Sequence, residues 1–113
     1  MGNHFVRVND TESFKQLTER SKERPVVIFK HSSTCPISSA AYEQMSGYEG
    51  EVALVEVQAA RQLSNEIENK LGVPHESPQV IVLSKGQVAW DASHFKITAE
   101  AVAEAVRKAE GTK

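Results

Sequence analysis

The chain has 113 residues, of which 40% are hydrophobic and 25% charged, and this suits a single folded domain spanning residues 1–113. Its 13 basic residues against 15 acidic ones give a net charge of -2, so neither nucleic acid nor an anionic membrane is an expected partner. No segment approaches the roughly 20 apolar residues that cross a bilayer, and the first residues lack a signal-peptide pattern. We therefore expect a cytoplasmic protein.

The first half of the chain is predicted to alternate strands and helices. Residues 5–8 can form a short strand, and Asn9 with Glu12 resembles a capping pattern that opens a first helix. The apolar, mostly β-branched run of residues 26–29 is typical of a strand buried on both faces. A polar turn over residues 31–34 then leads into a second helix, which carries its apolar residues on one face.

The second half continues the alternation and then changes to a hairpin. Residues 52–57 predict a strand, and residues 60–71 place apolar side chains at helical spacing before Gly72, which ends the helix. Strands are predicted over residues 79–83 and 87–92. Because so few residues separate them, these two strands must form an antiparallel hairpin.

A final helix is capped by Thr98 and precedes Gly111. A parallel β-α-β half followed by a hairpin and a helix predicts an α/β fold with helices on both faces of a mixed sheet. This is the thioredoxin-like fold, with four or five strands and about four helices.

The chain contains one cysteine, Cys35, which excludes an internal disulfide and a zinc site of several thiolates. Polar residues precede it, and Pro36 after it suits the first turn of a helix. The amino end of a helix stabilises negative charge, so we interpret Cys35 as a catalytic thiolate. The alternative is an inert, buried thiol.

Ser38 occupies the position at which a Cys-x-x-Cys protein has its second cysteine. A hydroxyl cannot resolve a disulfide, so a mixed disulfide on Cys35 would need an external small thiol for its release. Ser38 is also a possible hydrogen-bond donor to the Cys35 thiolate. The alternative is an ordinary packing serine in the first helical turn.

The Ser77-Pro78 pair stands at the entrance of an apolar strand, where a proline costs no interior ladder bond. The fold inference favours a cis peptide bond here, which would leave the backbone of Ser77 free to pair with an extended disulfide substrate. The alternative is a simple turn proline.

The histidines do not match a metal-ligand spacing, so no metal site is expected. His31, His75 and His94 are interpreted as polar loop residues, although His94 could lie near Cys35. Phe29 stands where thioredoxins place a buried acidic residue, so proton transfer of that kind is not expected.

Two segments carry a family resemblance: residues 29–38, Phe-Lys-His-Ser-Ser-Thr-Cys-Pro-Ile-Ser, and residues 75–79, His-Glu-Ser-Pro-Gln. They resemble the monothiol bacilliredoxin family of the bacillithiol system, and the similarity covers nearly the whole chain. The Thr-Cys-Pro-Ile element at residues 34–37 looks like the active-site motif of that family. It is fairly specific when a Ser-Pro pair follows about forty residues later.

The resemblance implies a disulfide oxidoreductase that removes bacillithiol from S-bacillithiolated client proteins. Cys35 would take over the bacillithiol, free bacillithiol would regenerate Cys35, and a separate NADPH-dependent reductase would recycle the bacillithiol disulfide. No bound cofactor is implied, because bacillithiol is a thiol co-substrate. By the same resemblance, the binding groove would be shaped by Thr34, Pro36, Ile37, Ser77 and Pro78. Spacing alone does not distinguish bacillithiol from glutathione.

Two other functions stay open at this point. One is an iron-sulfur carrier of the monothiol glutaredoxin type, in which one cysteine per subunit and an external thiol hold a cluster. Those proteins have Gly-Phe-Ser after the cysteine, whereas this chain has Pro36-Ile37-Ser38. The other is a binding module in which Cys35 is incidental.

Overall fold

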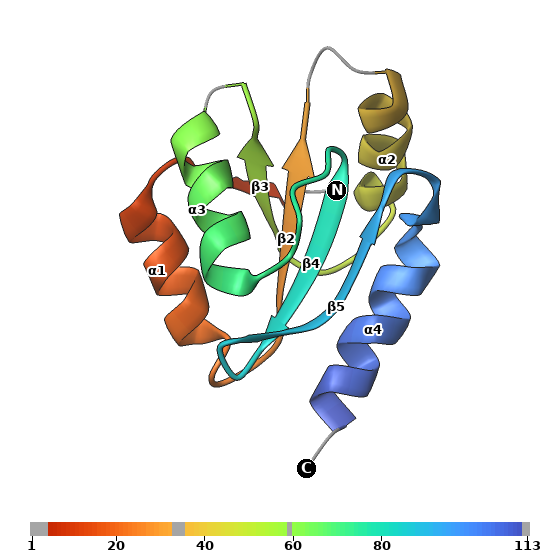
Figure 1. The fold of residues 1–113 in the computed structure, drawn as a ribbon. Helices are drawn as coiled ribbons and strands as arrows, with labels where there is room; N and C mark the ends of the chain where they lie inside the picture. The colour runs from red at the N-terminus through yellow and green to blue at the C-terminus, as the bar shows by residue number, and fades with distance from the viewer. Residues whose placement is uncertain (1–4, 33–35, 59, 112–113) are drawn as a thin grey trace.

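Strands and helices alternate along residues 5–32, 36–58 and 60–111, the parts of the chain that the computed structural model describes (Figure 1). The elements are β1 (Phe5–Arg7), α1 (Thr11–Arg20), β2 (Val26–His31), α2 (Pro36–Ser46), β3 (Val52–Glu56), α3 (Arg61–Leu71), β4 (Gln79–Ser84), β5 (Gln87–Ser93), the 3-10 turn η1 (His94–Lys96) and α4 (Ala99–Gly111). None of the helices in these ranges is long and apolar enough to cross a membrane.

The strands form one mixed sheet in the order β1-β3-β2-β4-β5. β1 and β2 both pair with β3 in parallel, whereas β4 runs antiparallel to β2 and β5 antiparallel to β4. Helices α1 and α3 cover one face of the sheet, and α2 and α4 cover the other (Figure 1). The α/β class and the thioredoxin-like arrangement predicted from the sequence are confirmed.

The central strand β2 separates two hydrophobic cores. Ile28 is fully buried against α1 and α3, and its neighbour Phe29 is fully buried against α2 and α4. Successive side chains of a strand point to opposite faces. Burial on both faces explains why this segment reads as a continuous apolar run rather than an alternating one.

The start of α1 and the end of β2 differ from the sequence-based prediction. Asp10, not Asn9, caps α1, since its carboxylate accepts a hydrogen bond of 2.9 Å from the Ser13 N–H. Strand β2 also runs on to His31, which pairs with Glu56 of β3. His31 is therefore not part of a polar turn, because the parallel partner strand extends the ladder past the apolar run.

The helix ends agree well with their sequence signals. Gly72 follows α3 with a left-handed φ of 72°, and its N–H donates to the Glu68 carbonyl. Thr98 caps α4 by accepting a 3.1 Å hydrogen bond from the Ala101 N–H. Helix α4 includes Gly111, which the sequence pattern placed just beyond the helix.

Candidate active site

One end of the sheet brings together the segments that the sequence singled out. Strand β2 ends there at His31, and β4 begins there at Gln79, immediately after Pro78. Lys30 pairs with Gln79 in the antiparallel ladder, so the end of β2 and the start of β4 lie side by side (Figure 1). Thr34 and Cys35 lie outside the described residues, as does the side chain of Ile37.

Helix α2 begins at Pro36, directly after Cys35 in the sequence, as the proline signal predicted. Ser38 is fully buried in its first turn, and the Ser38 Oγ accepts a 3.2 Å hydrogen bond from the Ser32 N–H. This bond joins the chain that leaves β2 to the start of α2. Ser38 thus has a packing role, and its hydrogen bond to a Cys35 thiolate stays a prediction.

The Ser77-Pro78 peptide bond is cis, which confirms the expectation from the fold. Pro78 is buried, and its carbonyl accepts a 3.1 Å hydrogen bond from the His94 N–H. The hydroxyl oxygen of Ser77 is buried and lacks a hydrogen-bond partner among the described residues. The roles of Ser77 and Pro78 in substrate binding stay predictions.

His31 is buried at the end of β2, with 8% of its surface exposed, so its interpretation as a loop residue is wrong. Its ring centroid lies 5.6 Å from that of Phe29 and 5.1 Å from that of Tyr42 on α2. Burial lowers the pKa of His31, and the Glu56 carboxylate opposes that change. The histidine is therefore a neutral member of an aromatic cluster at this end of the sheet.

Lys30 lies at this same end of the sheet, and the sequence analysis did not single it out. Its side chain is fully buried, and its Nζ has no hydrogen-bond partner in the described part of the chain. Burial lowers the pKa of Lys30 to about 8, while the carboxylates of Glu68 and Glu76 act in the opposite direction. The available signal was a lysine at the end of an otherwise apolar central strand.

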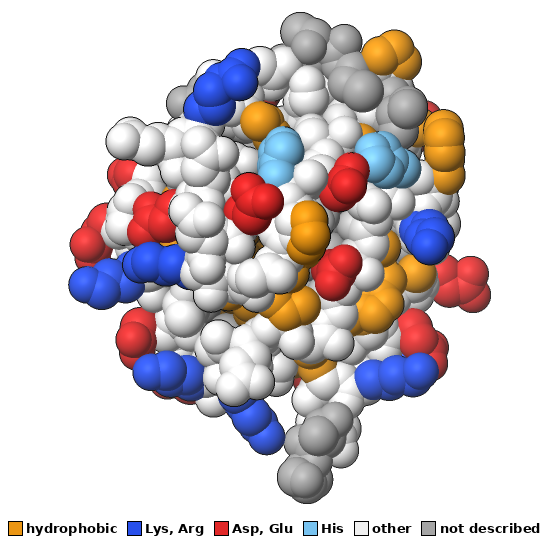
Figure 2. Space-filling view, viewed as in Figure 1, with side chains coloured by type: hydrophobic (Ala, Val, Ile, Leu, Met, Phe, Trp, Pro, Cys, Tyr) orange, Lys and Arg blue, Asp and Glu red, His pale blue; other side chains and the backbone are white. Residues whose placement is uncertain are grey.

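Residues 73–78 form a loop over the polar end of β2 and β4, and we call this segment the cis-proline loop. The His75 N–H donates to the Glu68 carboxylate at 3.2 Å, and His75 Nδ1 lies 3.2 Å from the Ser64 Oγ. Glu76 lies 3.5 Å from His94 Nε2. Figure 2 shows histidine and acidic side chains gathered on this face of the molecule. The loop is thus tied to both α3 and η1.

The described residues contain no group of three His, Cys, Asp or Glu side chains that could hold a metal ion. His75 lies in a loop as predicted, and His94 lies in η1 with a left-handed φ of 56°. The hydrogen bond to Pro78 brings His94 to the cis-proline. Cys35 lies outside the described residues, so the structure defines no distance between His94 and Cys35.

A shallow groove runs beside this end of the sheet, between α2 and η1. Its volume is about 260 Å³, and its lining includes Ala40, Ala41, Gln44, His94, Phe95 and Ile97. Phe95 is 76% exposed, which is unusual for a large aromatic side chain. The His94 N–H bond to Pro78 links one residue of the groove lining to the cis-proline loop.

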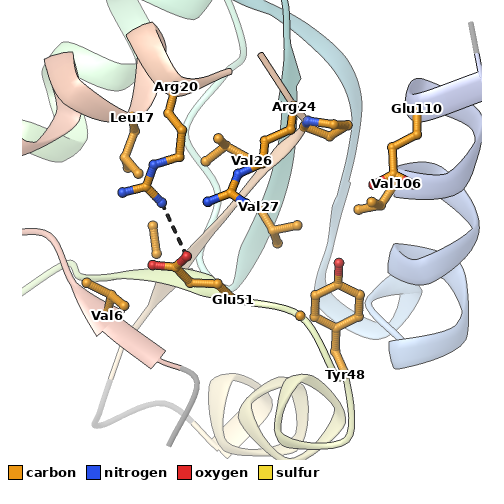
Figure 3. A pocket seen from close by; sticks show the side chains of 13 residues that line it. Val6, Leu17, Arg20, Arg24, Val26, Val27, Tyr48, Glu51, Val106 and Glu110 are labelled. Carbon is orange, nitrogen blue, oxygen red and sulfur yellow. Dashed lines mark hydrogen bonds and ion pairs between the residues drawn. The ribbon is translucent and has the colours of Figure 1, made fainter. Parts of the chain in front are cut away.

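A second pocket, of about 250 Å³, lies at the opposite end of β2, around Val26 and Val27 (Figure 3). Arg20 and Glu51 form a 3.2 Å ion pair across it. Since a strand rises about 3.3 Å per residue, the length of β2 separates this pocket from the cis-proline loop. We assign no part in the chemistry of Cys35 to it.

Comparison with solved structures defines the class of this protein. A protein described as a candidate oxidoreductase with a thioredoxin fold matches with a TM-score of 0.83 and 33% identity, over 90% of this chain and 93% of that one. A thioredoxin from Schistosoma mansoni matches with a TM-score of 0.69 and 14% identity, over 94% and 98% of the two chains. A Halobacterium salinarum thioredoxin mutant matches with a TM-score of 0.71 and 10% identity, over 97% and 94%. The chain is a thiol redox protein with a thioredoxin-like fold.

The family follows from a second comparison. The protein-family model described as "Monothiol bacilliredoxin BrxC" matches residues 6–102. The chain therefore belongs to the monothiol bacilliredoxin family, which confirms the resemblance in residues 29–38 and 75–79.

Proposed function

We propose that this chain removes bacillithiol from S-bacillithiolated proteins through Cys35. The family match supports the bacillithiol system as the source of the co-substrate. The observation that carries the proposal is that the chain has one cysteine, directly before the first residue of α2, and a buried serine three positions later. Such a protein can accept a thiol in a mixed disulfide but cannot expel it by itself.

The proposed exchange has two steps, and each step forms one disulfide bond and breaks another. The Cys35 thiolate attacks the bacillithiol sulfur of the client disulfide, so a Cys35–bacillithiol disulfide forms and the client thiolate leaves. A second bacillithiol, as thiolate, then attacks the bacillithiol sulfur of this mixed disulfide. Cys35 leaves as a thiolate, and bacillithiol disulfide departs for reduction by a separate NADPH-dependent enzyme.

The surroundings suit a substrate that lies along the end of the sheet. Thr34, Pro36 and Ile37 border the nucleophile in sequence, and Ser77 precedes the cis-proline. The backbone of Ser77 is the proposed pairing partner for the extended disulfide. The groove that contains Phe95 adjoins the same loop, so we place the client polypeptide there.

Intact-mass spectrometry tests the proposal directly. The chain is incubated with an S-bacillithiolated client, and the adduct mass is expected to move from the client to this chain, while Cys35→Ala accepts none. Addition of free bacillithiol is then expected to remove the adduct. Absence of transfer from the client would defeat the proposal, and a parallel S-glutathionylated client shows whether the small thiol is recognised.

Anaerobic reconstitution with iron and sulfide separates this function from cluster carriage. A colourless protein is expected, because Pro36 stands where cluster-carrying relatives have a glycine. A coloured preparation with stoichiometric iron and sulfide would favour the carrier function instead.

A further inference from the structure

The pocket at the start of β2 has an apolar floor to which both hydrophobic cores contribute. Its volume is about 250 Å³. Val26 belongs to the core beneath α1 and α3, while Val27 belongs to the core beneath α2 and α4. Both side chains line the pocket, and Val106 of α4 lines it as well. The apolar part of a small ligand can therefore be removed from water there.

One wall of the pocket is an aromatic ring that lies against a glycine. Tyr48 and Gly50 both line the pocket from the loop between α2 and β3. A Cβ at Gly50 would lie 2.7 Å from the Tyr48 Oη and 2.9 Å from its Cζ, so only a glycine allows the ring to lie there. Burial and the Glu110 carboxylate raise the pKa of Tyr48. The hydroxyl is therefore a hydrogen-bond donor at neutral pH.

Two guanidinium groups reach into the pocket from the end of α1 and the turn that follows it (Figure 3). Arg20 forms a 3.2 Å ion pair with Glu51. Arg24 has no carboxylate within ion-pair distance in the ranges that the structure describes. A guanidinium offers a planar fork of N–H donors that matches the two oxygens of a carboxylate. The pocket thus combines an apolar floor with a positive group suited to a carboxylate.

Glu110 limits the charge that a ligand can carry. Glu110 and Val106 lie on the α4 side of the pocket, across from Arg24 (Figure 3). A ligand with one carboxylate can direct it toward Arg24 and its apolar part toward Val106. A second carboxylate on the far side of the ligand would approach Glu110, and like charges repel each other. The lining therefore favours a monocarboxylate over a dicarboxylate.

We propose that this pocket is a second binding site, which takes a small organic monocarboxylate with an aromatic or branched apolar part. The carboxylate pairs with Arg24, and the apolar part lies on Val26 and Val27 beside the Tyr48 ring. The length of β2 separates this site from the cis-proline loop. The ligand therefore binds without occupying that end of the sheet, and the proposal does not depend on the proposed function.

Titration with benzoate, followed by ¹H–¹⁵N NMR, tests the proposal. Benzoate is expected to shift the amide signals of Tyr48, Gly50 and Glu51 until they saturate, with a Kd of about 2 mM, as suits a ligand of so few atoms. Benzyl alcohol has the same ring without the charge, and terephthalate adds a second carboxylate. Both are expected to bind at least about fivefold more weakly than benzoate.

Two variants separate the charge from the shape of the pocket. Arg24→Gln is expected to raise the Kd for benzoate at least about fivefold. The matched control is Arg61→Gln, because Arg61 is also exposed and without an ion pair in the described ranges but lies at the start of α3. It is expected to leave the Kd unchanged. Gly50→Ala displaces the Tyr48 ring without changing any charge, and it is also expected to weaken benzoate binding.

Three results would overturn the proposal. They are the absence of saturation in the parent up to about 20 mM benzoate, equal Kd values in Arg24→Gln and Arg61→Gln, and benzoate shifts confined to the groove beside Phe95. No step of the titration involves Cys35 or bacillithiol, so its result is separate from a failure of client transfer.

Discussion

Lys30 and Gln79 lie opposite each other across the ladder of β2 and β4, and each holds a buried polar atom without a hydrogen-bond partner among the described residues. These atoms are a donor, Lys30 Nζ, and an acceptor, Gln79 Oε1, while Gln79 Nε2 donates to the Pro74 carbonyl at 3.0 Å. Ladder partners point to the same face of a sheet, so both side chains face α3. The interior at this end of the sheet therefore contains polar groups that lower the stability of the fold.

The first prediction is that Lys30→Met folds more stably than the parent. At pH 7 the free energy of unfolding is expected to rise by about 1 to 4 kcal/mol, because an apolar side chain replaces a buried charge without a partner. Burial lowers the pKa of Lys30 to about 8 from its usual 10.5. Between these values the unfolded chain binds more protons, so the parent gains stability as pH rises.

The difference in unfolding free energy between Lys30→Met and the parent is therefore expected to become smaller as pH rises from about 8 to about 10.5. Urea denaturation at several pH values measures it, and groups that titrate alike in both proteins cancel in the difference. A variant that is less stable than the parent at every pH would show that Lys30 stabilises the fold, contrary to the structure.

The sequence predicted the parts of this site that have local signals. Pro36 indicated the start of α2, the apolar run indicated β2, and the fold inference placed a cis bond at Ser77-Pro78. The position of Lys30 at the end of an apolar run was only a weak signal of its burial, and the burial of His31 had no local signal. The burial of both depends on β3 extending the ladder past Phe29 and on α3 and the cis-proline loop covering the end of the strand.

His31 gives a second prediction, on the acid side of neutrality. Burial lowers its pKa below the usual 6.5, so below about pH 6.5 the unfolded state binds a proton that the folded state resists. The parent is therefore expected to lose stability as pH falls through this range. The variant His31→Phe keeps an aromatic ring beside Phe29 and Tyr42 but has no titrating group there. Its unfolding free energy is expected to fall less than that of the parent over the same pH range.

Urea unfolding at about pH 7 and about pH 5 compares the two proteins. His75, whose pKa burial also lowers, is present in both and cancels in the comparison. An equal loss of stability in parent and variant would mean that His31 does not titrate as its burial requires.

Gly72 gives a third prediction, about the junction of α3 and the cis-proline loop. Its φ of 72° lies in the left-handed region, and a Cβ there would meet nothing within 4 Å. Gly72→Ala is therefore expected to cost about 1 kcal/mol of unfolding free energy from backbone strain alone. Gly111→Ala, also in open space but without a positive φ, is the control and is expected to cost nothing. Equal effects of the two changes in urea denaturation would contradict this account.

Ser38→Cys gives the last prediction, on the reaction itself. The side chain lies in the first turn of α2, three residues after Cys35, where the introduced thiol can attack the mixed disulfide from within. The Cys35–bacillithiol adduct is then expected to fall at least about tenfold in intact-mass spectra, replaced by an internal disulfide two mass units lighter than the reduced protein. Ser39→Cys supplies the same thiol one position further on, at an exposed site, and is expected to keep the adduct. If the adduct levels of Ser38→Cys and Ser39→Cys were equal, the absence of an internal second thiol would not be the reason that Cys35 needs an external thiol. The proposed dependence on free bacillithiol would then require another cause.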